Sequence, residues 1–205
     1  MKNSHITTII FDYGGVLLEW DPRHLYRRFF PNQPEAMERF LTEINFVGWN
    51  AQQDKGRPFA EAVESLSAEF PHYAHLIRAY DELWEESLTG TIDGTIDILK
   101  QLKAMKYPLY GLSNWSGETF LRARHKYDFF NLFDDMVISG EVKMIKPEPE
   151  IFHHALQKFG KNANECIYID DSLPNVTQAQ KMGFHAIHFH SPEQLRESLQ
   201  GLSII

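Results

Sequence analysis

Polar residues that could carry out chemistry stand behind short apolar runs at four places in the chain. They are, in chain order, Asp12, the pair Ser113-Asn114, Lys146 and the pair Asp170-Asp171. Each group alone has an ordinary structural interpretation, such as a turn, a helix cap or a solvated surface residue. The acidic pair is the most informative, because two like charges repel each other unless a cation offsets them. Together these groups would form a site for a metal ion and a phosphate group.

The apolar runs in front of these residues predict strands. Five runs are short and mostly apolar, as expected for strands covered on both faces, and they span residues 6–11, 109–112, 136–138, 166–169 and 186–189. Helical patterns separate the later runs, for example over residues 98–105 and after Pro149. This alternation predicts an α/β fold with a Rossmann-like parallel sheet. Ligands bind at the carboxyl ends of such strands, which is where the polar groups fall.

Residues 20–90 interrupt this rhythm and contain no convincing strand. Three helical patterns with apolar faces span residues 37–44, 59–70 and 76–88. We therefore predict an α/β core of residues 1–18 and 90–205, with an all-helical insertion at 19–89. The aromatic residues of the insertion are expected to pack in its interior rather than to bind a cofactor.

The composition narrows the classes of partner. The 205 residues include 20 Lys and Arg against 28 Asp and Glu, a formal net charge of −8. An acidic chain disfavours binding to nucleic acids and to anionic membranes. No apolar stretch is long enough to span a membrane, and the N-terminus has no apolar signal-peptide core, so a cytoplasmic location is expected. Cys166 is the single cysteine, which excludes an intramolecular disulfide, and it is expected to be buried.

The motifs at the strand ends resemble those of the haloacid dehalogenase-like hydrolase superfamily, whose members are mostly phosphatases. The similar segments span residues 11–17, 112–114, 146–152 and 169–172, with Asn175 following the last. The resemblance implies that the helical insertion is the cap of that family. Within it, Trp49 followed by Asp54-Lys55-Gly56 is similar to a subgroup that includes bacterial sugar-phosphate phosphatases of the glucose-1-phosphate type.

The resemblance implies a role for each residue at the strand ends. Asp12 would be the nucleophile, which takes the phosphoryl group and forms an acyl phosphate. Mg²⁺ is the implied cofactor, with Asp12 and Asp171 as direct side-chain ligands and the Gly14 carbonyl as a further ligand. Asp170 would act through water or orient the site, although the two adjacent acids could exchange these roles.

The same resemblance implies how the substrate is held. Ser113, with help from Asn114, would bind the phosphoryl oxygens. Lys146 would act in binding and catalysis, because its charge neutralises Asp12 and the phosphoryl group. The expected activity is that of a magnesium-dependent phosphatase, a hydrolase acting on a small phosphorylated metabolite, with a sugar phosphate as one candidate.

The sequence departs from the family at Gly14. Most phosphatases of the family have there a second Asp, which is general acid toward the leaving group and then base toward water, a contribution of about 10²–10⁴-fold. Gly14 leaves three explanations open. Another side chain or water supplies the proton, the substrate has a leaving group that needs little protonation, or the protein is a weak catalyst. Dehalogenases of the family also lack this Asp and need no metal. Dehalogenation and a non-catalytic binding or regulatory role therefore stay open as alternatives, although the pair Asp170-Asp171 favours the phosphatase.

Other polar clusters have weaker claims to a function. His188 and His190 would share one face of the last strand while His185 points away, which favours ordinary rim histidines over a zinc site. A solvated face is favoured over a second phosphate site for Arg23, Arg27 and Arg28. The remaining candidates for substrate contact, among which the sequence does not distinguish, are Trp20, Trp49, Trp115, Lys55 and Arg57. The oligomeric state is not predicted.

Overall fold

The core of the molecule is a sheet of five strands. In the computed structural model, which describes residues 6–205, they are β1 (Thr8–Phe11), β4 (Leu109–Ser113), β5 (Asp135–Ile138), β6 (Cys166–Asp170) and β7 (His185–His188). Their order is β5-β4-β1-β6-β7, and all neighbouring strands are parallel. The predicted parallel sheet and its five strands are confirmed. Residues 1–5 of the predicted core segment 1–18 lie outside the described part.

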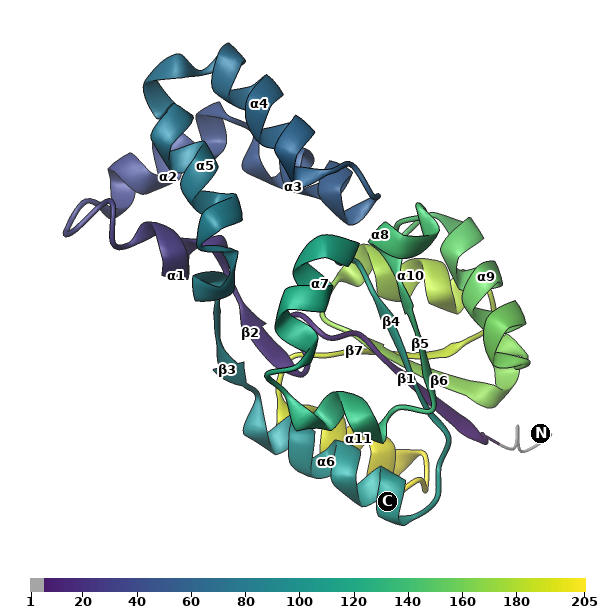
Figure 1. Ribbon diagram of the computed structural model, residues 1–205. Coiled ribbons are helices and arrows are strands. Elements are labelled where there is room, and N and C mark those ends of the chain that lie inside the picture. The colour runs from purple at the N-terminus through teal and green to yellow at the C-terminus, as the bar shows by residue number, and fades with distance from the viewer. Residues whose placement is uncertain (1–5) are drawn as a thin grey trace.

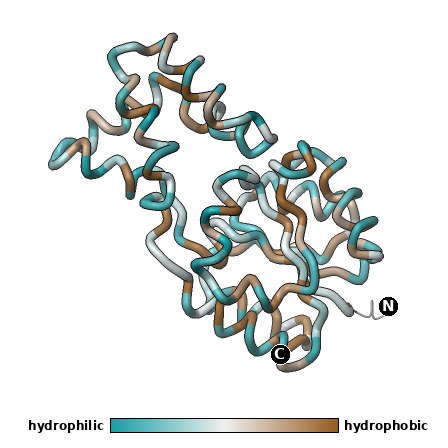
Figure 2. Tube along the Cα trace, in the orientation of Figure 1, coloured by the Kyte–Doolittle hydropathy of each residue, from teal (hydrophilic) through white to brown (hydrophobic). Residues whose placement is uncertain are grey.

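Helices cover both faces of this sheet (Figure 1). On one side lie α6 (Asp93–Ala104) and α11 (Pro192–Gly201), and on the other α9 (Pro149–Phe159) and α10 (Leu173–Lys181). Successive strand residues point to opposite faces, so Ile9 and Phe11 belong to one hydrophobic cluster and Ile10 to another. Figure 2 shows the resulting hydrophobic stretches along the central strands. Cys166 is fully buried here, as predicted.

A separate group of helices stands over the carboxyl ends of the strands (Figure 1) and is called the cap below. Its members are α1 (Pro22–Tyr26), α2 (Pro34–Glu43), α3 (Phe46–Asp54), α4 (Phe59–Glu69), η1 (Pro71–Tyr73), α5 (Ala74–Glu82) and η2 (Trp84–Ser87). Buried aromatic rings fill its interior, with centroids 4.9 Å apart for Tyr26 and Phe40 and for Phe46 and Tyr80. The aromatic residues thus pack the cap, as predicted.

The prediction of no strand in residues 20–90 is wrong at both ends of that segment. β2 (Leu18–Trp20) and β3 (Leu88–Thr91) form an antiparallel ribbon, through which the chain enters and leaves the cap. The predicted boundaries at 18/19 and 89/90 fall inside this ribbon. Strands of three and four residues, about 70 positions apart, are too short for a pattern of alternating polarity to reveal them.

Four further short helical segments belong to the core. They are α7 (Gly117–Arg124), α8 (Ser139–Val142), η3 (Asp128–Leu132) and η4 (Ala163–Glu165). The first two matter for the site, because α7 begins shortly after β4 and α8 follows β5 directly. None of the helices in residues 6–205 combines the length and the apolar character that a membrane crossing requires.

Candidate active site

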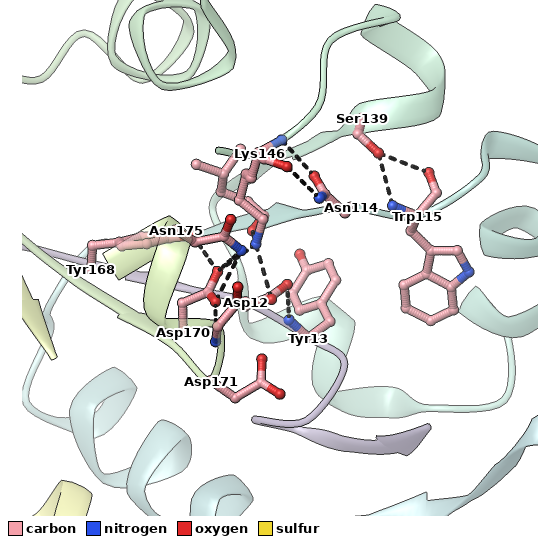
Figure 3. Close-up of polar contacts among 12 residues, drawn as sticks. Asp12, Tyr13, Asn114, Trp115, Ser139, Lys146, Tyr168, Asp170, Asp171 and Asn175 are labelled. Carbon is pink, nitrogen blue, oxygen red and sulfur yellow. Dashed lines mark hydrogen bonds and ion pairs between the residues drawn. The ribbon is translucent and has the colours of Figure 1, made fainter. Parts of the chain in front are cut away.

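The predicted residues come together where β1, β4 and β6 end (Figure 3). β1 pairs with β4 on one side and with β6 on the other. Asp12 follows β1, while Ser113 and Asp170 are the last residues of β4 and β6. All three side chains are buried, with at most 7% of each residue exposed. A parallel sheet therefore assembles the site from segments that are far apart in the chain, since Asp12 lies more than a hundred residues before Ser113 and Asp170.

Lys146 is the electrostatic centre of the site. Its ammonium group is buried and contacts three acceptors, with Nζ 2.9 Å from Asp12 Oδ2, 2.7 Å from Asp170 Oδ2 and 2.9 Å from the Leu112 carbonyl. Burial lowers the pKa of Lys146, but the two carboxylates outweigh it and hold the pKa above its usual value. The side chain stays charged and can neutralise an anion bound beside Asp12.

Asp170 is held by several donors at once. Ser172 N donates to its Oδ1 at 2.8 Å, Asn175 Nδ2 lies 3.1 Å from both oxygens, and the Tyr168 hydroxyl donates to Oδ2. Burial raises the pKa of Asp170, but Lys146 more than offsets that effect and the pKa lies below its usual value. The carboxylate is thus ionised and fixed in place. Sequence reasoning missed Tyr168, although it precedes Asp170 by two residues and so shares its face of the strand.

Asp12, Asp170 and Asp171 form the one group of three metal-ligating side chains found among residues 6–205. One carboxylate oxygen from each lies within 4.8 Å of the others. The pKa of Asp12 is raised to about 7, chiefly by burial; the charges of the other two acids also raise it, and Lys146 opposes this rise. Burial and the neighbouring Asp170 also raise the pKa of Asp171. Oxygen donors with uncompensated negative charge suit Mg²⁺, and the exposed Asp171 is more open to a cation than the fully bonded Asp170.

Two glycines follow the candidate nucleophile. A Cβ placed on Gly14 would meet no heavy atom within 4 Å, so the position beside the site is open. Gly15 has a left-handed backbone with φ of +71°, and a Cβ there would lie 2.2 Å from Asp171 Oδ2. Gly15 therefore lets the backbone turn against Asp171, whereas Gly14 leaves space where most family phosphatases carry an acid.

Ser113 and Asn114 differ in what they contact. The Ser113 hydroxyl lies beside Asp12 and lowers its pKa. Asn114 binds the backbone of Lys146 from both sides, since Lys146 N donates to Asn114 Oδ1 at 2.8 Å and Asn114 Nδ2 donates to the Lys146 carbonyl at 2.9 Å. Asn114 thereby positions Lys146, and its predicted contact with substrate stays a prediction.

The cap completes the walls of the site. A cavity of about 70 Å³ lies between Gly14, Ser113, Asn114 and Trp115 of the core and Trp20, Asn50, Asp54 and Trp84 on the cap side. A wider cleft of about 690 Å³ continues from it between the cap and the Lys146 loop. Of the further residues that the sequence offers as candidates for substrate contact, Trp20 and Trp115 line the cavity. Trp49 is buried in the cap and donates to the Ala62 carbonyl.

The remaining residues with a possible function bind other residues of the protein. Lys55 forms an ion pair with Glu148, and Arg57 donates to Gln53. In the part of the chain that the structure describes, His185, His188 and His190 form no group with metal-ligand geometry. His188 instead contacts the Asp171 carbonyl at 2.9 Å.

Two of the cap arginines are paired with acids. Arg23 binds Glu38 and Asp21, and Arg28 binds Glu86. At least 42% of each arginine side chain is exposed, in keeping with the predicted solvated face.

Comparison with known proteins agrees with this geometry. Sesquiterpene phosphatase astK of Aspergillus oryzae is 27% identical over 180 residues, 87% of this chain and 87% of that protein. The phosphorylated carbohydrates phosphatase of Thermotoga maritima is 23% identical over 186 residues, 88% of this chain and 83% of that protein. Drimenol cyclase drtB of Aspergillus calidoustus is 25% identical over 199 residues, 96% of this chain but 36% of that protein, so the chain spans about a third of its length.

A solved structure shows the same architecture. The HAD family enzyme bt-2542 of Bacteroides thetaiotaomicron, in complex with magnesium and inorganic phosphate, is 27% identical with a TM-score of 0.68. The likeness covers 91% of this chain and 95% of that one. A family model described as haloacid dehalogenase-like hydrolase matches residues 6–183, which contain all the strand-end residues discussed above. The chain therefore belongs to the haloacid dehalogenase-like hydrolases.

Proposed function

We propose that the protein is a magnesium-dependent phosphatase that acts on a small phosphorylated metabolite through a phosphorylated Asp12. The convergence of Asp12, Asp170 and Asp171 around a buried, charged Lys146 carries this proposal. The attacking carboxylate and the phosphoryl group are both negatively charged, so positive charge beside the carboxylate must offset their repulsion. Lys146 supplies it on one side, and the acid cluster offers a cation site on the other.

The chain's own residues would divide the work as follows. Asp12 attacks phosphorus. Its carboxylate is oriented by Lys146, which contacts Oδ2, and by Tyr13 N, which donates a hydrogen bond to Oδ1 at 2.7 Å. Ser113 binds a phosphoryl oxygen beside Asp12. When bound, the cation offsets repulsion between Asp12 and the phosphoryl group, and Asp12, Asp171 and the Gly14 carbonyl would hold it. Asp170 keeps Lys146 in position.

The cleft between cap and core supports a small substrate. Its walls combine apolar side chains such as Leu41, Phe46 and Val47 with polar ones such as Thr42 and Asn45. Relatives of this chain are named for terpenoid and for carbohydrate substrates, and a mixed lining fits an organic group of either kind. A cap above the strand ends excludes bulk water from the reacting atoms and leaves no room for a folded protein or a duplex.

Asp12→Asn tests the function directly. An amide is a far poorer nucleophile than a carboxylate, so we expect turnover of 4-nitrophenyl phosphate with Mg²⁺ to fall by at least about 10³-fold. Chelation of the metal should abolish wild-type turnover as well. Brief reaction with radiolabelled substrate and an acid quench should trap label on the wild type alone. Activity of Asp12→Asn close to that of the wild type would refute the proposal. Metal-independent release of halide from a 2-haloacid would instead establish the dehalogenase alternative.

A further inference from the structure

Gly14 stands where most phosphatases of the family carry an acid, and another acidic residue lines the cavity beside it. Gly14 and Ser113 line one wall of the 70 Å³ cavity, and Asp54, the last residue of α3, lines the cap side. The space next to Gly14 is empty of heavy atoms within 4 Å. An acidic residue therefore lines this cavity, but it comes from the cap instead of the first strand-end motif.

Asp54 is held in position by cap and core together. Ser116 N, at the start of α7, donates to its Oδ1 at 3.1 Å, and Asn50 Nδ2 donates to its Oδ2 at 2.9 Å. The Ser139 hydroxyl at the start of α8 donates to the Asp54 carbonyl at 2.5 Å. The Asn50 orientation is itself set, because its Oδ1 accepts from the Tyr80 hydroxyl at 3.0 Å. Docking of the cap on the core thus places this carboxyl group.

The surroundings of Asp54 favour its protonated form. Burial raises the pKa of this carboxyl to about 7, although the Ser116 N–H lowers it. The hydrogen-bond donors to this carboxyl, Asn50 Nδ2 and Ser116 N, are uncharged, and none of the ion pairs seen within residues 6–205 involves Asp54. An acid that gains and loses its proton near neutral pH can serve first as a donor and then as an acceptor.

We propose that Asp54 is the general acid and base of the reaction, brought by the cap to the place that Gly14 leaves open. This inference rests on the proposed phosphatase function. In the first step an Asp12 oxygen bonds to phosphorus, the bond from phosphorus to the leaving oxygen breaks, and the Asp54 proton passes to that oxygen. The products are the free alcohol, the acyl phosphate on Asp12 and the Asp54 carboxylate.

The second step restores the enzyme. Water attacks phosphorus and gives a proton to the Asp54 carboxylate, while the bond between phosphorus and Asp12 breaks. Inorganic phosphate leaves, Asp12 is again a carboxylate and Asp54 again an acid. Because Asp54 reaches the cavity only from the docked cap, proton transfer would require the closed molecule, and an open one would lack its acid.

Dependence on the leaving group separates this role from a structural one. The probes are 4-nitrophenyl phosphate, whose leaving group departs readily as an anion, and phenyl phosphate, whose leaving group needs a proton. We expect Asp54→Asn to lower kcat/KM for phenyl phosphate by about 10²–10⁴-fold and for 4-nitrophenyl phosphate by less than about 10-fold. Rapid mixing of Asp54→Asn with 4-nitrophenyl phosphate should show one equivalent of fast product, then slow turnover, since the base is also lost.

Two further variants make the test decisive. Asp81→Asn removes another cap aspartate that contacts α7, through Arg122 at 2.8 Å, and is the matched control for cap docking. It should lower kcat/KM by less than about fivefold for either substrate. Gly14→Asp in the Asp54→Asn background places a carboxyl on the opposite wall, and we expect it to restore phenyl phosphate turnover at least about 10-fold.

The outcomes distinguish the two proposals. If the wild type and Asp12→Asn behave as a phosphatase should, but Asp54→Asn lowers both substrates equally or neither, Asp54 is only a contact between cap and core and the inference falls. If the wild type turns over neither substrate with Mg²⁺, or Asp12→Asn stays active, the proposed function fails and the inference fails with it. Circular dichroism and urea unfolding of Asp54→Asn test for a folding defect. Selective rescue of phenyl phosphate turnover by Gly14→Asp in the same background excludes one, because a folding defect would lower turnover of both substrates in both variants.

Discussion

Gly15 couples the backbone of the first motif to the acids of the candidate cation site. Its φ of +71° disfavours any side chain, and a Cβ would collide with Asp171 Oδ2 at 2.2 Å. Gly15→Ala should therefore move Asp171 and weaken Mg²⁺ binding by about 10–100-fold, as measured by calorimetry. Gly160→Ala is the control, because Gly160 has a similar φ of +64° but open space around its Cβ position. Both variants should lose roughly 1–2 kcal/mol of stability, and equal Mg²⁺ affinities would contradict this account.

The residues of the candidate site could be predicted well where they follow the end of a strand. Asp12, Lys146, Asp170 and Asp171 were predicted from their places behind apolar runs, and the structure brings them together. The same logic could not find the contacts of Asp54. That residue stands in a cap helix, and only the tertiary fold places its carboxyl against α7.

At the scale of elements, the sheet could be predicted and the connections around it could not. Buried parallel strands are apolar throughout, and this signal survives in four or five residues. After Leu18 the β2–β3 ribbon contains only exposed or partly buried residues, so no such run marks it. α3 was missed because polar Asn50 and Gln53 are buried beside Phe46 and Trp49, which removes the usual division into apolar and polar faces.

Burial of Asp54 at the end of α3 should make stability depend on pH. Burial raises the pKa of Asp54 from near 4 to about 7, so between these values the folded chain holds a proton that the unfolded chain has lost. Stability therefore falls as pH rises through this range, by up to about 1.4 kcal/mol per pH unit, and the loss is complete above about pH 7.

Asp54→Asn should remove this part of the pH dependence. Urea unfolding of the metal-free wild type and variant at pH 5 and pH 8 measures this dependence. The stability of the variant relative to that of the wild type should be higher at pH 8 than at pH 5. The shift should be about 1 kcal/mol or more. Parallel stability curves for the two proteins would show that Asp54 titrates alike in the folded and unfolded states.

At the scale of the whole molecule, ion pairs join the cap to the core. Within residues 6–205 three of them cross between the two parts, Lys55–Glu148, Arg122–Asp81 and Lys126–Glu85. Their side chains are between 28% and 52% exposed, so each pair is worth less than about 1 kcal/mol and is screened by salt. We expect the three pairs together to favour contact between the cap and the core, and thus the position of Asp54 at the cavity.

Salt should therefore open the cap and slow the reaction. Between 0.1 M and 1 M NaCl the screening length falls from about 10 Å to about 3 Å, and we expect kcat/KM for phenyl phosphate to fall several-fold. Salt also weakens substrate binding at Lys146, so the comparison needs a variant that keeps the site and lacks the three pairs. Glu148→Gln, Asp81→Asn and Glu85→Gln combined should begin with the lower activity and respond less steeply to salt. Equal salt dependence in the two proteins would show that these pairs do not govern closure, because any remaining effect would then arise at the phosphate site itself.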